Sequence, residues 1–365
     1  MAAKKRWPGS VRIGHTTIGG ESPTYIIAEA GVNHNGDLSL ALEMVSAAAA
    51  MGADAVKFQA FSARRLVTPD ASAAGYQRAG KQRELLERLE LQPEDFVAIA
   101  AQCAAQGIEL LVTPFGSEDV AMVVGLGVRA MKVASPDLAN PPLLKAVART
   151  GLPVLLSTGA ADMKEIAAGL DTLEQAGTTE VALLHCVSSY PTPLHEAQLR
   201  CIGTLAKKFG IPVGYSDHTM DLQVGELAVQ AGACLLEKHF TLDPTMDGPD
   251  QAMSLRPVEL ASYINRARAA RRGELNESAL DEPHRQALGD GVKKVRPLEQ
   301  DVRQAARCSV TSTVAIPKGT VIKASMLTLK RPAGGIPPAQ MDEVPGRKAA
   351  VDIPADTTIT EKMLK

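Results

Sequence analysis

The chain has 365 residues, 45% of them hydrophobic but only 3% aromatic, and a formal net charge of −2. This length predicts one large domain and a small one, and the near-neutral charge argues against nucleic acid as a partner. No apolar run reaches the ~18 residues of a membrane span, and five scattered cysteines without CxxC spacing favour a reducing compartment, so we expect a cytoplasmic protein with no membrane partner.

Short apolar runs alternate with amphipathic stretches from Tyr25 onward. Eight runs have the composition of buried strands: "YIIAEA" from residue 25, "AVKFQ" from 55, "IELLVTP" from 108, "AMKVAS" from 130, "PVLLST" from 153, "VALLHC" from 181, "IPVGYS" from 211 and "ACLLEKH" from 233. Helical patterns between them include residues 38–51, 93–106, 118–126 and 222–231, and glycines suited to a left-handed helix cap follow several helices at Gly52, Gly107, Gly151 and Gly232. Eight strand–helix units predict an α/β fold, a TIM (β/α)8 barrel over residues 1–275. A doubly wound sheet is disfavoured because no GxGxxG follows the first strand.

The composition changes after the predicted barrel. Residues 276–305 are charged and poor in strand signals, so we expect a linker with about one helical turn. Beyond it, "AIPKGTVIKASML" from residue 315 and "DIPADTTITEKML" from residue 352 share Ile, Pro, Thr, Ile, Met and Leu in register. This weak duplication predicts a compact β-rich domain over residues 306–365, small enough to need support from a neighbour.

Every predicted strand ends in side chains that can bind protons, phosphate or a metal ion. These ends carry Glu29, Lys57, Gln59, Thr113, Lys132, Ser135, Ser157, Thr158, His185, Ser216, Asp217, His218, Glu237, Lys238 and His239. One polar strand end is unremarkable, because a strand can simply run out into solvent. Polar ends on every strand indicate an active site, because a TIM barrel carries its chemistry at the C-terminal ends of its strands.

His218 and His239 close the seventh and eighth strands, which are neighbours in a closed barrel. Their imidazoles can therefore converge on one ion, and two histidines with substrate oxygens and water suit Mn²⁺, Co²⁺ or Zn²⁺. The alternative is that the rings only form hydrogen bonds in a polar rim, because two histidines do not complete a metal site.

Lys57 and Lys132 can clamp an anionic substrate. Hydroxyls that can assist them belong to Thr113, Ser135, Ser157 and Ser216. A lysine in a dry barrel pocket can also be a Schiff-base nucleophile, and the sequence leaves this alternative open. Glu29 closes an apolar strand, and it is either a general acid/base or the ion-pair partner of Lys57.

Several motifs resemble the sialic acid synthase family. They are "AEAGVNHNGDLSLALEMVSAAAAMGADAVKFQ", "VTPF", "LSTG", "LLHCVSSYPTP", "GYSDHT" and "EKHFTLD…GPDQAMSL", and the segment containing "LKRPAGGI" resembles the family's appended antifreeze-like (SAF) domain. The resemblance covers nearly the whole chain. It implies a transferase that joins phosphoenolpyruvate to an N-acetylated amino sugar, giving a nine-carbon 2-keto acid and phosphate.

The resemblance also implies roles for individual residues. Metal ligands for Mn²⁺ or Mg²⁺, with Co²⁺ as a further option, are His218 and His239. Phosphoenolpyruvate contacts are Lys57, Thr113, Lys132, Ser135, Ser157 and Ser216, and the acidic residue near the reacting carbons is Glu29. Sugar-side positions are Gln59, Tyr190 and Asp250. Arg331 matches an arginine that the SAF domain delivers into the partner subunit's active site, which implies a domain-swapped homodimer.

Two departures from the family pattern leave the acceptor open. Ser188 stands where the family commonly has Asn, and Pro136-Asp137 replaces Gly-Glu or Gly-Asp, keeping the carboxylate but stiffening the loop. Both positions face the sugar or the phosphate in the family. The candidate acceptors are N-acetylmannosamine, giving N-acetylneuraminate, and the 2,4-diacetamido-2,4,6-trideoxymannose of legionaminic acid synthases. Rival functions are a Schiff-base aldolase, a non-catalytic sugar- or ice-binding protein, and a synthase acting on a sugar phosphate, which the SAF domain argues against.

Overall fold

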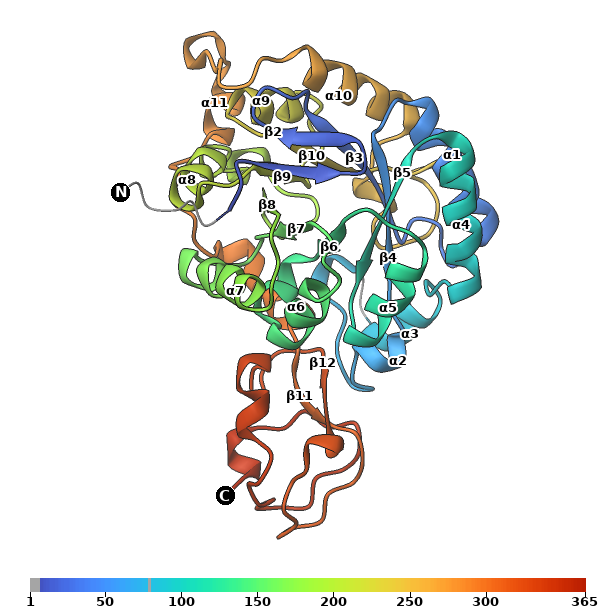
Figure 1. Ribbon diagram of the computed structural model, residues 1–365, viewed down its shortest axis with the longest axis vertical. Coiled ribbons are helices and arrows are strands. Elements are labelled where there is room, and N and C mark those ends of the chain that lie inside the picture. Colours follow the sequence, from blue (N-terminus) through green and yellow to red (C-terminus); the bar gives the residue numbers. More distant parts are fainter. Residues whose placement is uncertain (1–6, 78–79) are drawn as a thin grey trace.

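The computed structural model describes residues 7–77 and 80–365, and it consists of a barrel with a small domain beneath it (Figure 1). Within the described residues, eight parallel strands follow the order β5-β4-β3-β10-β9-β8-β7-β6, and the two ends of this order pack against each other. The strands are β3 (Tyr25–Gly31), β4 (Ala55–Ala60), β5 (Glu109–Pro114), β6 (Met131–Val133), β7 (Val154–Ser157), β8 (Val181–His185), β9 (Val213–Asp217) and β10 (Leu235–His239). They correspond to the predicted strands, so the predicted TIM barrel is confirmed.

Helices surround the barrel strands. They are α1 (Leu38–Ala50), α4 (Pro93–Gln106), α5 (Ser117–Gly125), α6 (Pro141–Ala148), α7 (Met163–Gln175), α8 (Arg200–Phe209), α9 (Val224–Gln230) and α10 (Pro257–Ala269). Helix α1 begins after Asp37, whose carboxylate accepts hydrogen bonds from the Ser39 and Leu40 amides and so satisfies two unpaired N–H groups. Gly107, predicted as a cap, has φ +69° at the end of α4. None of the helices in the described part of the chain has the length and apolar character needed to cross a bilayer.

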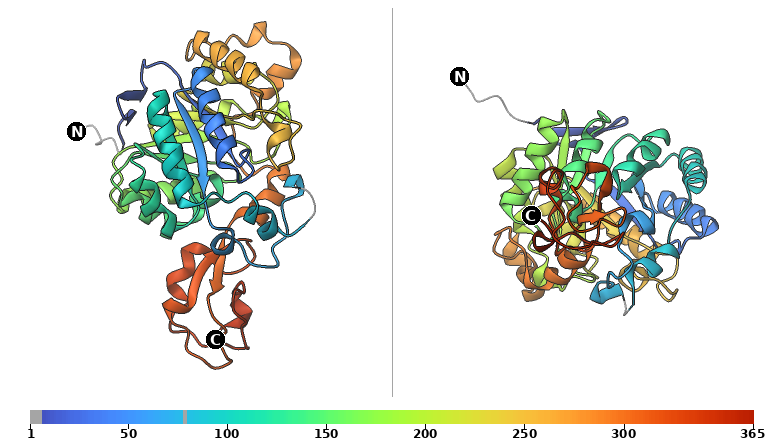
Figure 2. Two further views of the ribbon diagram at one scale, coloured as in Figure 1. Left: turned by 90° about the vertical axis from the view of Figure 1, so that its right-hand side faces the viewer. Right: turned by 90° about the horizontal axis from the view of Figure 1, so that it is seen from below.

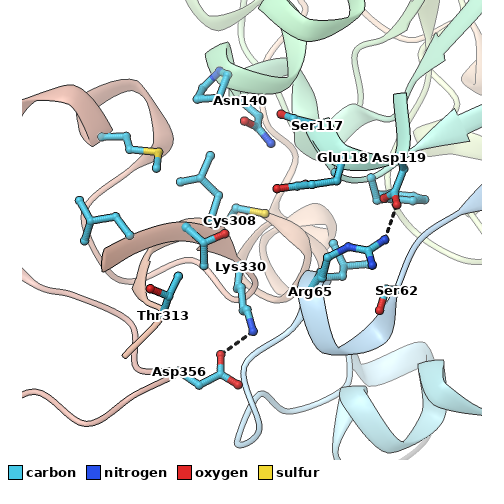
Figure 3. Close-up of a pocket in the computed structure, with 18 residues that line it drawn as sticks. Ser62, Arg65, Ser117, Glu118, Asp119, Asn140, Cys308, Thr313, Lys330 and Asp356 are labelled. Atoms are coloured by element: carbon cyan, nitrogen blue, oxygen red, sulfur yellow. Dashed lines mark hydrogen bonds and ion pairs between the residues drawn. The ribbon is translucent and has the colours of Figure 1, made fainter. Parts of the chain in front are cut away.

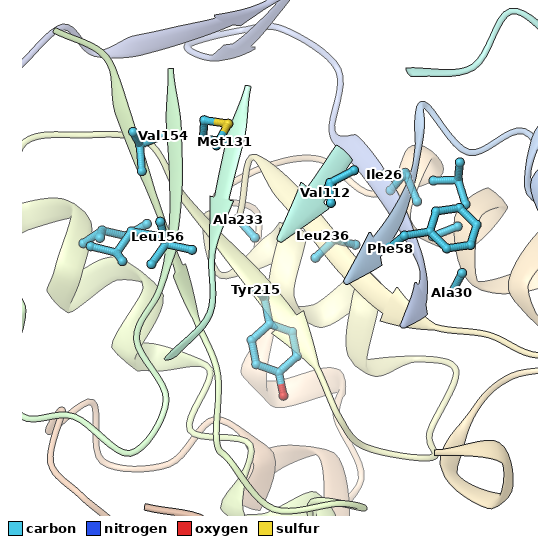
Figure 4. Packing of buried hydrophobic residues seen from close by; sticks show 14 of the residues in the cluster. Ile26, Ala30, Phe58, Val112, Met131, Val154, Leu156, Tyr215, Ala233 and Leu236 are labelled. Atoms are coloured by element: carbon cyan, nitrogen blue, oxygen red, sulfur yellow. The ribbon is translucent and has the colours of Figure 1, made fainter. Parts of the chain in front are cut away.

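Two apolar layers support the barrel. The outer layer lies between strands and helices and includes Ile26, Phe58 and Val112 (Figure 4). The inner layer fills the N-terminal half of the barrel with residues such as Ile27, Leu111 and Leu235. A hairpin of β1 (Ser10–Ile13) and β2 (Thr16–Gly19), which the sequence analysis did not predict, adds apolar side chains to this inner layer. The polar residues predicted at the strand ends lie beyond this layer, in the C-terminal half of the barrel.

The segment between the two domains is more ordered than the predicted linker. It contains α11 (Glu282–Ala287) and α12 (Gln300–Ala306), where about one turn was expected. The Leu199 amide donates to the Ala287 carbonyl at 3.0 Å, and Glu165 of α7 forms ion pairs with Arg303 and Arg307. The segment is thus bonded along its length to the barrel.

The C-terminal domain has its own apolar core and contains the paired strands β11 (Ser309–Ser312) and β12 (Leu327–Lys330). Ile316 and Ile353, equivalent positions of the sequence duplication, bond to each other through both backbone amides at 2.8 and 2.9 Å. The two copies of the duplicated sequence therefore pair with each other through antiparallel backbone hydrogen bonds. The domain lies against one end of the barrel (Figure 2), next to the loop containing α2 (Ala63–Leu66) and near α3 (Gln82–Glu87).

Candidate active site

A cavity of about 130 Å³ opens at the C-terminal ends of the barrel strands. Most of the predicted site residues line it: Glu29, Lys57, Gln59, Lys132, Ser135, Ser157, Tyr190, Ser216, His218, His239, Asp250 and Arg331. Thr113 lies one hydrogen bond away, because Lys57 Nζ donates to its Oγ1 at 3.3 Å. The barrel brings together side chains from Glu29 to Asp250, because parallel barrel strands all end on the same side, and the C-terminal domain adds Arg331.

Two buried lysines and two buried glutamates form the floor of this cavity. Lys57 Nζ lies 3.0 Å from Glu29 Oε2 and 3.4 Å from Glu237 Oε2. Lys132 Nζ lies 3.7 Å from Glu237 Oε2 and donates to Ser157 Oγ at 2.7 Å. Buried ion pairs contribute little net stability because both charges lose their hydration. Clusters of buried charges with shifted pKa values occur most often at functional sites, which makes this cavity a candidate site.

The four charged groups differ in how readily they exchange protons. Burial raises the pKa of Glu29 despite the opposing charge of Lys57, and Glu237 raises it further. The pKa of Glu237 itself falls to about 2, because Lys132 and Lys57 outweigh the effect of burial. The carboxylates of Glu237 and Glu29 outweigh burial at Lys57 and raise its pKa, whereas burial lowers that of Lys132. Glu237 is thus a fixed anion, Lys57 a fixed cation and Glu29 the better proton acceptor.

Glu237 was named among the polar strand ends but was given no individual role, although the sequence held a signal for one. Along a strand, alternate residues point to the same face, so Glu237 shares a face with His239 while Lys238 points the other way. In the structure Lys238 Nζ pairs with Asp217 at 3.0 Å, away from the cavity, whereas Glu237 and His239 line it.

His218 and His239 converge as predicted, with ring centroids 5.7 Å apart. Nδ1 of His218 lies 2.8 Å from the Val187 carbonyl oxygen, and because a carbonyl can only accept, Nδ1 carries the proton and Nε2 a lone pair. Burial lowers the pKa of both rings, so both are neutral near pH 7. Nδ1 of His239 is buried with no hydrogen-bond partner among the described residues, and it lies 3.9 Å from Asp250 Oδ2.

This donor set fits part of a divalent-metal site. Two neutral imidazole nitrogens are ligands that Mn²⁺, Co²⁺ and Zn²⁺ accept. The described residues contain no group of three or more His, Cys, Asp or Glu side chains arranged to hold a metal ion.

The predicted sugar-side residues lie next to the histidines. Gln59 Nε2 donates to Glu29 Oε1 at 2.9 Å, and the Tyr190 ring centroid is 4.3 Å from that of His218. Burial and, to a lesser extent, Glu29 raise the pKa of Asp250 to about 7. Asp250 can therefore exchange a proton near neutral pH.

Arg331 reaches the cavity of its own chain. Its amide donates to the Leu66 carbonyl at 2.9 Å, and its guanidinium lies 4.9 Å from the centre of the Phe115 ring. Burial raises the pKa of the nearby Asp137 to about 6, although Arg331 opposes this. Delivery of Arg331 thus needs no second chain in this structure, and the domain-swapped homodimer stays a prediction.

Asp137 and Ser188 do not line the cavity, although both were predicted to bind substrate. Asp137 is buried behind it, where Asn140 donates to its Oδ1 at 3.0 Å. The Ser188 hydroxyl points toward Gly159, where an added Cβ would lie 2.2 Å from it. Their proposed substrate contacts therefore stay predictions, because each side chain is turned toward protein instead.

A larger cavity of about 460 Å³ lies between the barrel and the C-terminal domain (Figure 3). Four of its charged side chains pair with one another, Arg65 with Asp119 and Lys330 with Asp356. The smaller cavity, where titratable groups with shifted pKa values converge, is the better candidate for chemistry.

Comparisons with known proteins extend over nearly the whole chain. Residues 44–276 match the NeuB family and residues 307–365 match the SAF domain. N,N'-diacetyllegionaminic acid synthase of Legionella pneumophila is 37% identical over 93% of this chain and 94% of its own. The crystal structure of spore coat polysaccharide biosynthesis protein SpsE of Bacillus subtilis superposes with a TM-score of 0.83 at 30% identity, covering 98% of this chain and 99% of that one.

The SAF domain does not argue against a sugar-phosphate acceptor, contrary to the expectation from the sequence. Human N-acetylneuraminate-9-phosphate synthase, named for a phosphorylated product, is 32% identical over 95% of this chain and 94% of its own. That alignment extends into the C-terminal domain, so the domain does not discriminate between the acceptors. Both parts of the chain nevertheless agree with the sequence resemblance. The chain belongs to the NeuB, or sialic acid synthase, family and carries a C-terminal SAF domain.

Proposed function

We propose that this protein joins phosphoenolpyruvate to the open-chain aldehyde of an N-acetylated amino sugar, with water, to give a nine-carbon 2-keto sugar acid and phosphate. The observation that carries the proposal is the convergence of Lys57 and Lys132 with the neutral imidazoles of His218 and His239 in one buried cavity. Relatives named as synthases of N,N'-diacetyllegionaminic acid, N-acetylneuraminate 9-phosphate and pseudaminic acid support this type of condensation.

Lys57 and Lys132 would bind the phosphate group. The hydroxyls beside them belong to Ser135, Ser157 and Ser216. Each ammonium already contacts a carboxylate at 3.0 to 3.7 Å, so the phosphate competes with Glu29 and Glu237 for the same cations. As Lys57 turns toward phosphate, Glu29 loses its neutralising partner and becomes a stronger base. Substrate binding thereby prepares Glu29 for proton transfer.

The carbon–carbon bond forms when C3 of phosphoenolpyruvate attacks the aldehyde carbon. Positive charge then develops at C2, where Glu237 supplies a fixed negative charge in a cavity of low dielectric. Water adds to C2 and gives its proton to Glu29, which Gln59 orients through the 2.9 Å hydrogen bond. Glu29 passes this proton to the alkoxide that the aldehyde oxygen has become, and the proton of the new C2 hydroxyl leaves with the phosphate. The resulting tetrahedral intermediate expels phosphate by cleavage of its C–O bond. The barrel contributes orientation, because every participating group is fixed at a strand end or an adjacent loop.

His218 and His239 would hold a divalent ion, Mn²⁺ or Mg²⁺ with Co²⁺ as an alternative, which acts as a Lewis acid toward the aldehyde when bound. The chain's own contribution is to keep both rings neutral by burial and to direct the Nε2 lone pair of His218 away from Val187.

Apolar side chains share the cavity with the charged ones and bear on the choice of acceptor. They belong to Val32, Leu86, Leu89, Phe115, Val302 and Ala306. Such a lining favours an acceptor with methyl and acetamido groups in place of hydroxyls. The 2,4-diacetamido-2,4,6-trideoxymannose acceptor is therefore favoured over N-acetylmannosamine, and relatives from Legionella pneumophila and Campylobacter jejuni with the corresponding name are both 37% identical.

The test is product analysis with a panel of acceptors. Phosphoenolpyruvate labelled with ¹⁸O in the bridging position would be incubated with the trideoxy sugar, N-acetylmannosamine and N-acetylmannosamine 6-phosphate. Mass spectrometry should detect a nine-carbon acid, with the label in the released phosphate and turnover lost on adding EDTA. Borohydride trapping of a pyruvate adduct on Lys132, without phosphate release, would instead establish the Schiff-base alternative.

A further inference from the structure

One peptide group connects a buried carboxylate to His218. The Ser188 N–H donates to Glu299 Oε1 at 2.8 Å, and the carbonyl of the same peptide unit, that of Val187, accepts from His218 Nδ1 at 2.8 Å. Glu299 immediately precedes α12, in the segment that joins the barrel to the SAF domain. The cavity histidine and the interdomain segment are thus two hydrogen bonds apart.

Glu299 is fully buried, at 0% exposure, and its described partners are backbone amides. Oε1 also accepts from the Ala160 N–H at 2.6 Å, and Oε2 accepts from the Arg296 N–H at 2.8 Å. Ala160 has φ +47°, a left-handed conformation that is unfavourable for alanine. A carboxylate held by three amides is fixed in position, and it secures the loops that follow both β7 and β8.

The charge of Glu299 acts on His218 through the peptide. An anion that accepts from the N–H polarises the peptide group and makes its carbonyl a stronger acceptor. A stronger acceptor at Val187 favours the tautomer with the proton on Nδ1. The Ser216 hydroxyl oxygen lies 3.4 Å from Nε2, but its single proton goes to Glu237 Oε1 at 2.9 Å, so Ser216 donates no hydrogen bond to Nε2. The lone pair on Nε2 is therefore left for a ligand.

We propose that Glu299 is a positioning residue that holds His218 in its ligating tautomer and orientation, so that the site is complete only when the interdomain segment is docked on the barrel. The inference rests on the proposed function in that it takes His218 to be a metal ligand. In many metal sites a carboxylate contacts the ligand histidine directly. Here the carboxylate acts through the peptide group between Val187 and Ser188. It belongs to the segment that also contains α12, whose Val302 and Ala306 line the cavity.

Glu299→Gln tests the charge while keeping the shape. The matched control is Glu282→Gln, which removes an exposed carboxylate from α11 of the same segment. We expect Glu299→Gln to weaken Mn²⁺ binding about tenfold, the lower end of the range for residues that support a metal ligand, as measured by electron paramagnetic resonance on the substrate-free protein. We also expect ¹⁵N NMR of the His218 ring to show a larger Nε2-protonated fraction, and kcat to fall more than the KM for phosphoenolpyruvate rises.

The outcomes separate the inference from the proposed function. If Glu299→Gln melts like the wild type but keeps its Mn²⁺ affinity and its His218 tautomer, the inference is wrong, whatever happens to turnover. The more disruptive variant Glu299→Ala removes the whole carboxylate group. If it fails to fold, Glu299→Gln still tests whether Glu299 positions His218. If the wild-type protein makes no product with any acceptor, the proposed function fails, while the NMR measurement still tests the link between Glu299 and His218.

Discussion

Lys57 and Glu29 form a buried ion pair across adjacent strands, with Nζ and Oε2 3.0 Å apart and less than 6% of either side chain exposed. The two residues are register partners on β4 and β3. Their contact therefore follows from strand pairing and does not depend on a mobile loop.

We expect Lys57→Met to lower kcat/KM for phosphoenolpyruvate by at least about a hundredfold. The substitution removes a cation from the anion-binding side and leaves Glu29 without its partner, and loss of one member of a buried pair costs several kcal/mol. Steady-state phosphate release measures the effect. Lys207→Met, at an exposed position of α8, is the control and should be indistinguishable from wild type. Wild-type kinetics in Lys57→Met would remove this lysine from the proposed phosphate site.

The barrel and most of the cavity were predictable because the relevant signals are local. Apolar runs, helical periodicity and cap glycines defined the alternating elements, and the closed topology then placed Glu29, Lys57 and His239 at one end. Glu299 gave no comparable signal. It lies 111 positions from Ser188, its hydrogen-bond partner, in a charged segment without strand or helix periodicity. Its role depends on how that segment docks, which only the three-dimensional structure reveals.

Arg331→Ala should raise the KM for the acceptor sugar and leave that for phosphoenolpyruvate nearly unchanged. The guanidinium lies over the Phe115 ring, whereas the lysines proposed to bind phosphate have carboxylate partners of their own. Kinetics with each substrate varied in turn measure the split. Arg347→Ala, which removes an arginine paired with Glu361 within the SAF domain, is the control. Unchanged values for both substrates would contradict a role for Arg331 in the site.

Mixing two impaired variants, assayed at low acceptor concentration, tests which chain supplies Arg331. In a domain-swapped dimer, Lys57→Met and Arg331→Ala subunits together form one site with both native residues, so co-refolding restores part of the activity. If Arg331 acts on its own barrel, as in this structure, every chain stays defective. Because Arg331 contacts the cavity of its own chain in this structure, we expect no activity to be restored. Recovered activity would instead establish the domain-swapped dimer that the family resemblance implies.

Asp137 should make the protein less stable as the pH rises from about 4 to about 6. Its pKa is 3.8 in the unfolded chain and about 6 when folded, chiefly because burial disfavours the charged form. Between these values the folded state holds a proton that the unfolded state has lost, so the free energy of unfolding falls with increasing pH, by roughly 3 kcal/mol in total. This loss of stability is what it costs the folded protein to keep a negative charge on Asp137, near Arg331, at neutral pH.

Urea denaturation of wild type and Asp137→Asn at several pH values measures this effect. The variant should gain stability relative to wild type as the pH increases through the window. Asp342→Asn, at an exposed position of the SAF domain, should show no such trend. A constant difference between Asp137→Asn and wild type from pH 4 to pH 7 would show that Asp137 has an ordinary pKa in the folded protein.

Lys238 and Asp217 lie behind the two histidines and should act as a unit. They are register partners on β10 and β9, their side chains are at most 1% exposed, and Nζ and Oδ2 are 3.0 Å apart. Asp217 Oδ1 also accepts from the Thr219 amide and hydroxyl, so the pair fixes the backbone on either side of His218.

Lys238→Met should lower the free energy of unfolding by about 3–5 kcal/mol, because it leaves a buried carboxylate unpaired. Lys238→Met with Asp217→Asn should recover a large part of that loss, because no isolated charge remains. Chemical denaturation of both single variants and the double variant gives the coupling energy. If the two losses simply add, the residues do not interact in the folded protein. If instead the double variant is stable but binds Mn²⁺ more weakly than wild type, the pair is kept for the alignment of His218 and His239 and contributes little to stability.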